Sequence, residues 1–163
     1  MAAEALSWFE VTDEVPSLAG AVKSRFTAHP HHVLATVHAD GRPRVNGTNV
    51  FFTEGHLWIG TMPNAARARD LDRFPWCALH SAPLDEKLGD GSGDARIEAR
   101  AVRLEPVMAQ HLLSVTNPGG DGPRSGEFYE LLVHSMSLIE VDGDSLAIRI
   151  WTAGGDEQEI RRS

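Results

Sequence analysis

The hydrophobic pattern of the chain changes period at residue 33, from the spacing of a helix to the spacing of a strand. Between residues 16 and 27, apolar side chains recur at every fourth position: Leu18, Val22 and Phe26. This spacing predicts a short amphipathic helix that ends before His29-Pro30. From residue 33 onward, apolar residues alternate with other residues, which predicts a strand over 33–37 with both faces partly covered. Residues 1–13 are expected to form a loosely ordered lead-in.

Short turns divide the rest of the chain into predicted strands and helices. Asp40-Gly41 and Glu54-Gly55 separate runs of strand-forming residues, and Asp-Gly is a strong hairpin signal. The runs predict antiparallel strands over residues 33–37, 42–53, 56–61, 76–81, 94–105, 135–141 and 145–152. Helices are predicted over residues 64–73 and 106–115, and a helical turn over 127–133. Gly47 lies inside a predicted strand, where glycine indicates a bulge or the close approach of another backbone or a ligand.

These elements predict an α+β fold in which six or seven antiparallel strands form a barrel with a few short helices. The 163 residues are expected to fold as a single domain over 1–163, because a chain of this length is large enough for one core. Polar, glycine-rich segments over 83–93 and 117–126 predict long loops.

The composition excludes several classes of function. The net charge of −8 argues against nucleic acid binding and against docking on an anionic membrane surface. No stretch reaches about 20 apolar residues, and the N-terminus lacks the pattern of a secretion signal. A cytoplasmic protein without a membrane span is therefore expected. The single cysteine, Cys77, lies in an apolar run and is interpreted as a small core residue.

An anion site is predicted at the start of the helix over 64–73. Free backbone N–H groups there could hold a phosphate together with three side chains: Thr61, Asn64 and Arg67. Two more arginines lie on the same helix: Arg69 and Arg73. The alternative is a solvated helix in which Asp70 and Asp72 pair with the arginines.

The second predicted strand carries a row of polar residues at alternate positions, so they face one way: Arg42, Arg44, Asn46 and Thr48. One interpretation is the solvated face of a barrel strand. The other is a binding face, where Asn46 and Thr48 hydrogen-bond a planar heterocycle while Arg44 meets an anionic group.

The chain lacks the common catalytic motifs. No HExxH motif, GxSxG elbow, P-loop or glycine-rich dinucleotide fingerprint is present. His29, His31 and His32 cluster without a carboxylate at a useful spacing, so no metal site is expected. An enzymatic function would therefore depend on a bound cofactor that carries the chemistry.

Five stretches of the chain occur in an order typical of one protein family. They are 33–43 (VLATVHADGRP), 56–61 (HLWIGT), 67–71 (RARDL) with 73–75 (RFP), 97–104, and 146–151 (LAIRIW) followed by Gly154-Gly155 and Arg161. Together they resemble the pyridoxamine 5′-phosphate oxidase-like, flavin-binding split β-barrel family over roughly residues 17–162. Asp70 stands where many relatives have asparagine.

The resemblance implies a split β-barrel that forms a homodimer, with a cofactor site in each cleft between the subunits. The cofactor would be FMN, or alternatively the deazaflavin F420. Arg67 takes the place of the family's phosphate ligand, with Thr61 and Arg69 beside it. Two residues lie where the second strand meets the flavin ring: Asn46 and Thr48. Trp151 lies near the place where the partner subunit closes over the cofactor.

We therefore expect an FMN- or F420-dependent oxidoreductase that transfers hydride to or from a small organic substrate, with no side chain needed as a dedicated acid or base. One alternative is a flavin-binding carrier or sensor without turnover. Another is a heme-binding relative that uses one of the eight histidines as an axial ligand. FMN is preferred to F420 because Asp70 and Asp72 would repel the polyglutamate tail of F420.

Overall fold

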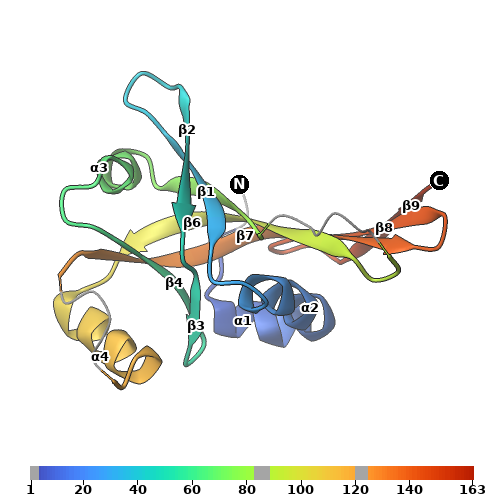
Figure 1. Cartoon of the computed structure of the whole chain (residues 1–163), viewed down its shortest axis with the longest axis horizontal. Coiled ribbons are helices and arrows are strands. Elements are labelled where there is room, and N and C mark those ends of the chain that lie inside the picture. Colours follow the sequence, from blue (N-terminus) through green and yellow to red (C-terminus); the bar gives the residue numbers. More distant parts are fainter. Residues whose placement is uncertain (1–3, 83–88, 120–124) are drawn as a thin grey trace.

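A computed structural model describes residues 4–82, 89–119 and 125–163 of the chain (Figure 1). Four helices and nine strands lie within these residues. In chain order they are α1 (Trp8–Glu14), α2 (Pro16–Thr27), β1 (His32–Val37), β2 (Pro43–Thr48), β3 (Phe51–Thr53), β4 (His56–Thr61), α3 (Ala66–Arg73), β5 (Trp76–His80), β6 (Gly93–Arg103), α4 (Pro106–Thr116), β7 (Glu127–Asp142), β8 (Ser145–Thr152) and β9 (Gln158–Arg162).

All nine strands belong to one antiparallel sheet, ordered β2-β1-β5-β6-β7-β4-β3, with β8 paired to β7 and β9 paired to β8. The long strand β7 organises this sheet because it pairs with β4, β6 and β8 along its length. The sheet is not closed, since β2 and β3 lie at opposite ends of the strand order. The predicted α+β class with an antiparallel split barrel is confirmed.

The main core lies between the sheet and the first two helices, which Figure 1 shows side by side below the sheet. α2 contacts β6 and β7 with the apolar face that its sequence period predicted, and Leu18, Val22 and Phe26 are fully buried. Burying one such side chain contributes about 1.5–3 kcal/mol. A smaller apolar cluster lies apart from this core, where Leu112 of α4 packs with Trp58 and Phe128.

The expected loosely ordered lead-in is wrong for residues 7–13, because α1 begins there. Ser7 caps this helix in a reciprocal capping box: its hydroxyl accepts from the backbone N–H of Glu10, and its own backbone N–H donates to the Glu10 carboxylate. Trp8 and Val11 are buried, so the core holds the helix in place. The Ser-x-x-Glu pattern was the sequence signal for this helix.

The helical turn predicted over residues 127–133 is also wrong, because that segment is the first half of β7. Tertiary pairing with β4 and β6 overrides the local propensity there. The predicted strand over 42–53 is divided into β2 and β3, and β9 adds a further strand near the C-terminus. The described sheet therefore has nine strands rather than six or seven.

Parts of both predicted loops, residues 83–88 and 120–124, lie outside the described residues. Of the helices that the structure describes, none is both long and apolar enough to cross a membrane.

Candidate functional site

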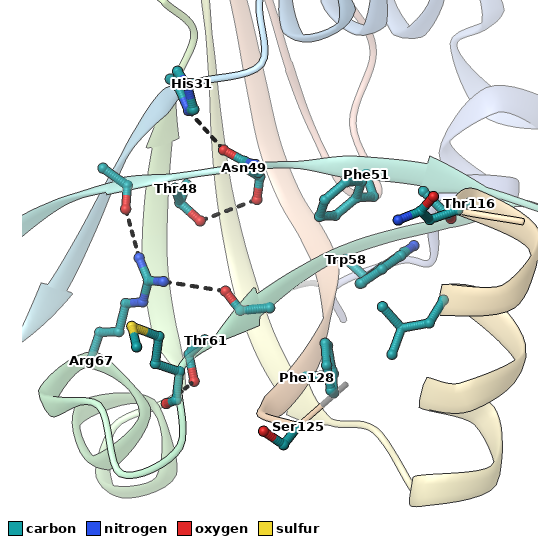
Figure 2. A pocket seen from close by; sticks show the side chains of 15 residues that line it. His31, Thr48, Asn49, Phe51, Trp58, Thr61, Arg67, Thr116, Ser125 and Phe128 are labelled. Carbon is teal, nitrogen blue, oxygen red and sulfur yellow. Dashed lines mark hydrogen bonds between the residues drawn. The ribbon is translucent and has the colours of Figure 1, made fainter. Parts of the chain in front are cut away.

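A cavity of about 560 Å³ opens between the ends of β2 and β4, the strand β3, and helix α4 (Figure 2). Its described lining is His31, Gly47, Thr48, Asn49, Phe51, Trp58, Gly60, Thr61, Met62, Arg67, Leu113, Thr116, Asn117, Ser125 and Phe128. Figure 2 shows Arg67 and Thr61 at one end and the aromatic side chains toward the other. The cavity therefore combines a cationic end with an aromatic wall.

Arg67 lies at the cationic end and bridges two strands that do not pair with each other. Its Nη1 donates to the carbonyl oxygen of Gly47 on β2 at 2.6 Å, and its Nη2 donates to that of Gly60 on β4 at 3.3 Å. Burial lowers the pKa of this guanidinium from its ordinary value, because desolvation disfavours the charged form. No carboxylate among the described residues pairs with it.

The chain conformation before α3 places Arg67 in the first turn of that helix. Asn64 has a φ of 58°, in the left-handed region that asparagine tolerates better than most residues. The helix then begins at Ala66, and no side chain caps its N-terminus. The uncapped first turn leaves backbone N–H groups next to Arg67, an arrangement that favours anions.

Three aromatic residues from different strands form the opposite wall. Phe51 stacks on Trp58 with ring centroids 4.5 Å apart, and Phe128 meets Trp58 edge-on at 6.1 Å. The indole N–H of Trp58 donates to Thr53 Oγ1 at 3.2 Å, and that hydroxyl lies 2.7 Å from Thr116 Oγ1 on α4. These contacts hold the wall and α4 together, so this end of the cavity is lined by a preformed aromatic surface.

His31 and Asn49 form a polar pair at the edge of the cavity. The Nδ1 atom of His31 lies 2.9 Å from Oδ1 of Asn49. Because an amide oxygen only accepts, Nδ1 carries the proton and donates it to Asn49. The second ring nitrogen, Nε2, has no hydrogen-bond partner within the described residues.

A buried ion pair lies behind the cavity and anchors α3. The Nε atom of Arg44 donates to Asp70 Oδ2 at 2.6 Å, and the hydroxyl of Thr36 donates to the same oxygen at 2.9 Å. Burial raises the pKa of the Asp70 carboxyl, but the hydrogen bonds from Arg44 and Thr36 outweigh it, and the net shift is downward. The carboxylate therefore stays ionised and ties α3 to the β1–β2 hairpin.

Of the eight residues predicted to bind the cofactor, the structure brings three to this cavity: Thr48, Thr61 and Arg67. The other five lie outside its lining: Arg44, Asn46, Asn64, Arg69 and Trp151. Asn46 shares the face of β2 with Arg44, and its side-chain nitrogen is buried without a partner among the described residues. Arg69 donates to the carbonyl oxygen of Asn64 at 2.6 Å. Trp151 is 1% exposed and belongs to the main core.

Alternation along β2 correctly placed Arg44, Asn46 and Thr48 on one face, but only Thr48 is near the open end of the strand. The aromatic wall was missed because its members are far apart in sequence, as Phe51 and Phe128 illustrate. Trp58 lies in a strand that the sequence predicted, but the sequence did not indicate which aromatic side chains contact it. His31 was considered only as a metal ligand. Within the described residues, no group of three or more His, Cys, Asp or Glu side chains is placed to hold a metal ion.

An open antiparallel barrel flanked by short helices defines the split-barrel class of proteins. The family model of pyridoxamine 5′-phosphate oxidase matches residues 18–122. The chain belongs to this family, as the ordered motifs predicted. A comparison with curated protein sequences finds no match.

Solved structures share this fold at low sequence identity. PhzG from Burkholderia lata, in complex with tetrahydrophenazine-1-carboxylic acid, has a TM-score of 0.59 at 16% identity, covering 96% of this chain and 93% of PhzG. HutZ, the heme storage protein from Vibrio cholerae, has a TM-score of 0.55 at 16% identity, covering 84% of this chain and 95% of HutZ.

A longer protein of unknown function, Atu2129 from Agrobacterium tumefaciens, has a TM-score of 0.61 at 15% identity over 73% of this chain. The chain spans 54% of the length of that protein. At these identities the likeness establishes the fold alone.

Proposed function

We propose that the protein is a cytoplasmic FMN-dependent oxidoreductase that transfers hydride to or from a small organic substrate. The observation that carries this proposal is Arg67, a partly buried guanidinium without a carboxylate partner among the described residues. A desolvated cation is costly unless an anion compensates it, and this chain has a net charge of −8. A phosphate at the N-terminus of α3 would supply that anion.

The residues present fit FMN in both of its parts. The phosphate would lie against Arg67 and Thr61, and the planar ring would lie toward the aromatic wall of Phe51 and Trp58. When bound, FMN supplies the hydride chemistry. The chain's own residues would hold the phosphate, orient the ring and exclude water through the apolar wall.

The charges around the cavity support FMN over F420. Within the described lining, Arg67 is the one arginine, which suits a single compact anion better than a polyglutamate tail. The other candidate arginines have partners: Arg42 pairs with Asp40, Arg44 and Arg73 with Asp70, and Arg69 with a backbone carbonyl. The repulsion of the F420 tail that was expected from Asp70 and Asp72 does not distinguish the two cofactors, because both residues lie outside the cavity lining.

We also propose a homodimer in which the second copy covers an apolar face of the sheet. Ala35 of β1 lies directly between Val45 and Ala78 in register, so all three share one face. Val45 is 68% exposed, and Trp76 on β5 is 37% exposed. Gly47 continues this face into the cavity, so a second copy seated here would wall the cofactor site.

Titration of the purified protein with FMN tests the cofactor proposal. Arg67→Gln should weaken FMN binding about 10- to 100-fold, because one charge-assisted contact is lost. Arg69→Gln is the matched control on the same helix, and its affinity should equal that of the wild type. Thermal unfolding must accompany both variants, since Arg67 also bridges β2 and β4. Equal FMN affinity in wild type and Arg67→Gln would remove Arg67 from the site.

A heme-binding protein is the second candidate, supported by the free Nε2 of His31 in the cavity lining and by the shared fold with HutZ. Absorbance of the protein as purified separates the candidates: a flavin band at about 450 nm, an F420 band at about 420 nm, or a Soret band. A flavin that binds but is never reduced or reoxidised by any acceptor would indicate a carrier or sensor instead.

A further inference from the structure

The ionisable side chains of the cavity are few, and this restricts how protons move there. Within its described lining, the two ionisable side chains are His31 and Arg67. Hydride transfer to a double bond is accompanied by the arrival of a proton, which a positioned side chain delivers faster than bulk water. Arginine does not deprotonate in proteins, whereas imidazole exchanges protons near neutral pH. His31 is therefore the side chain of this lining that is suited to proton transfer.

The hydrogen bond to Asn49 suits His31 to this task. Nδ1–H donates to the amide oxygen at 2.9 Å, and that bond persists whether Nε2 is protonated or not. The ring therefore keeps its position while Nε2 gains or loses a proton. Asn49 follows β2 directly and also lines the cavity. The pair is therefore fixed close in the chain to Gly47, whose carbonyl oxygen accepts a hydrogen bond from Arg67.

The neighbouring histidines do not share this arrangement. His32 is 3% exposed, and its Nδ1 accepts from the backbone N–H of Ala82 at 3.0 Å. Burial lowers the pKa of His32, which favours its neutral form. His29 is exposed, as His31 is, but it lies outside the cavity lining. Among charged and titratable residues, Arg67 lines the same cavity as His31, and His29 and His32 lie on the same segment of the chain.

We propose that His31 is a catalytic residue that donates the proton accompanying hydride transfer, with Asn49 as its positioning residue. This inference rests on the proposed FMN-dependent function. In the reductive direction, FMN would supply the hydride to one atom of the substrate double bond, and His31 would supply the proton. The Nε2–H bond of the His31 imidazolium breaks, and its proton adds to the adjacent atom. The substrate gains two electrons and two hydrogen atoms, the imidazole becomes neutral, and water reprotonates it.

Nitrogen NMR of the imidazole rings tests the geometry without turnover. In the wild-type protein at high pH, His31 should show a protonated Nδ1 and an unprotonated Nε2, and Asn49→Ala should abolish that preference. Addition of FMN should shift the His31 ring resonances and leave those of His29 unchanged. A protonated Nε2 in the neutral ring, or FMN binding that leaves His31 unshifted, would overturn the proposal.

Single-turnover reoxidation of the FMN-loaded, reduced protein by 2-cyclohexenone, an activated alkene that takes a hydride on one carbon and a proton on the next, tests the chemistry. His31→Gln should slow this step by about 100-fold or more, because glutamine cannot donate the proton. Asn49→Ala should have a smaller effect, and His29→Gln, the matched control, should behave as the wild type.

An unchanged rate in His31→Gln would refute the role of His31 while the FMN proposal stands. Failure of the wild-type protein to bind FMN would refute both proposals. FMN affinity, measured for each variant, distinguishes these outcomes, since His31→Gln should retain it within about threefold.

Discussion

Gly47 lines the cavity although neither backbone nor packing requires a glycine there. Its φ lies outside the left-handed region, and a Cβ at this position would meet no described heavy atom within 4 Å. Glycine inside a strand is less stable than alanine by about 0.5–1 kcal/mol. Gly60, which faces the same cavity, differs, because a Cβ there would lie 3.0 Å from the ring of Phe128. The open space at Gly47 is therefore available to the occupant of the cavity.

We predict that Gly47→Ala leaves the fold intact and weakens FMN binding by about tenfold or more, because the methyl group occupies ligand space. Its free energy of unfolding should match the wild type or exceed it by up to about 1 kcal/mol. Gly20→Ala is the control, since Gly20 also has open space but lies on α2, outside the cavity lining. Unchanged FMN affinity in Gly47→Ala would show that FMN does not occupy the space beside Gly47. A variant that loses the dimer but not FMN affinity would show that the second copy of the chain occupies that space instead.

At the scale of elements, α3 is held from two sides by its carboxylates. Asp70 joins it to β1 and β2 through Thr36 and Arg44. Asp72 accepts from Tyr129 of β7 at 2.9 Å and pairs with Arg103 of β6. The hydrogen bond from Arg103 lowers the pKa of Asp72 from its ordinary value. These contacts fix the helix that carries Arg67, although its own cap is missing.

We predict that Asp70→Ala lowers the free energy of unfolding by about 3–5 kcal/mol, because Arg44 is left as an uncompensated, partly buried charge. The double variant Arg44→Met with Asp70→Leu should recover much of that loss, since no buried charge remains. Urea unfolding at pH 7 measures both. A single variant as stable as the wild type would show that the pair does not anchor α3.

The same carboxylate predicts a dependence of stability on pH. The pKa of Asp70 in the folded protein is lower than its ordinary value of 3.8. Its contribution to stability is therefore fully present above that ordinary value and is lost as the pH falls through the folded pKa. The wild type should lose stability below about pH 4, and Asp70→Asn should lose less over the same window in urea unfolding. Parallel curves for both proteins would assign the acid sensitivity to other carboxylates.

At the scale of the whole molecule, the open sheet has a face that helices do not cover, where an apolar patch on β2, β1 and β5 adjoins Glu98 of β6. α1 and α2 pack on one side of the sheet, and α4 lies at the far end beside β3 (Figure 1). The face formed by Ala35, Val45 and Ala78 remains accessible. A second copy of the chain would bury it and border the cavity at Gly47.

We predict that Val45→Glu converts a dimer into a monomer of 17.8 kDa and weakens FMN binding, because a charge on this face cannot be buried against an apolar partner. Sedimentation at micromolar concentration measures the first effect. Val107→Glu is the control: Val107 is 81% exposed on α4, away from this face, and the variant should remain a dimer. A wild-type monomer under these conditions would contradict the dimer and the shared site.

Local patterns determined the parts of this protein that depend on near neighbours in the chain. The period of four at Leu18, Val22 and Phe26 predicted α2, and the Asp-Gly turn predicted the β1–β2 hairpin, because both rest on backbone geometry within a few residues. The ordered motifs were sufficient to predict the family, the class of fold and the position of Arg67 at a helix start.

Only the tertiary structure decided which polar residues reach the cavity. Arg44 was predicted to meet an anion, but it lies against Asp70, which is 26 positions further along the chain. The aromatic wall joins Phe51 to Phe128 because β7 pairs with β4, and no local pattern records that pairing. Local spacing orients a side chain relative to its own strand. The packing of distant elements determines whether that side lies against an ion pair, an apolar wall or an open cavity.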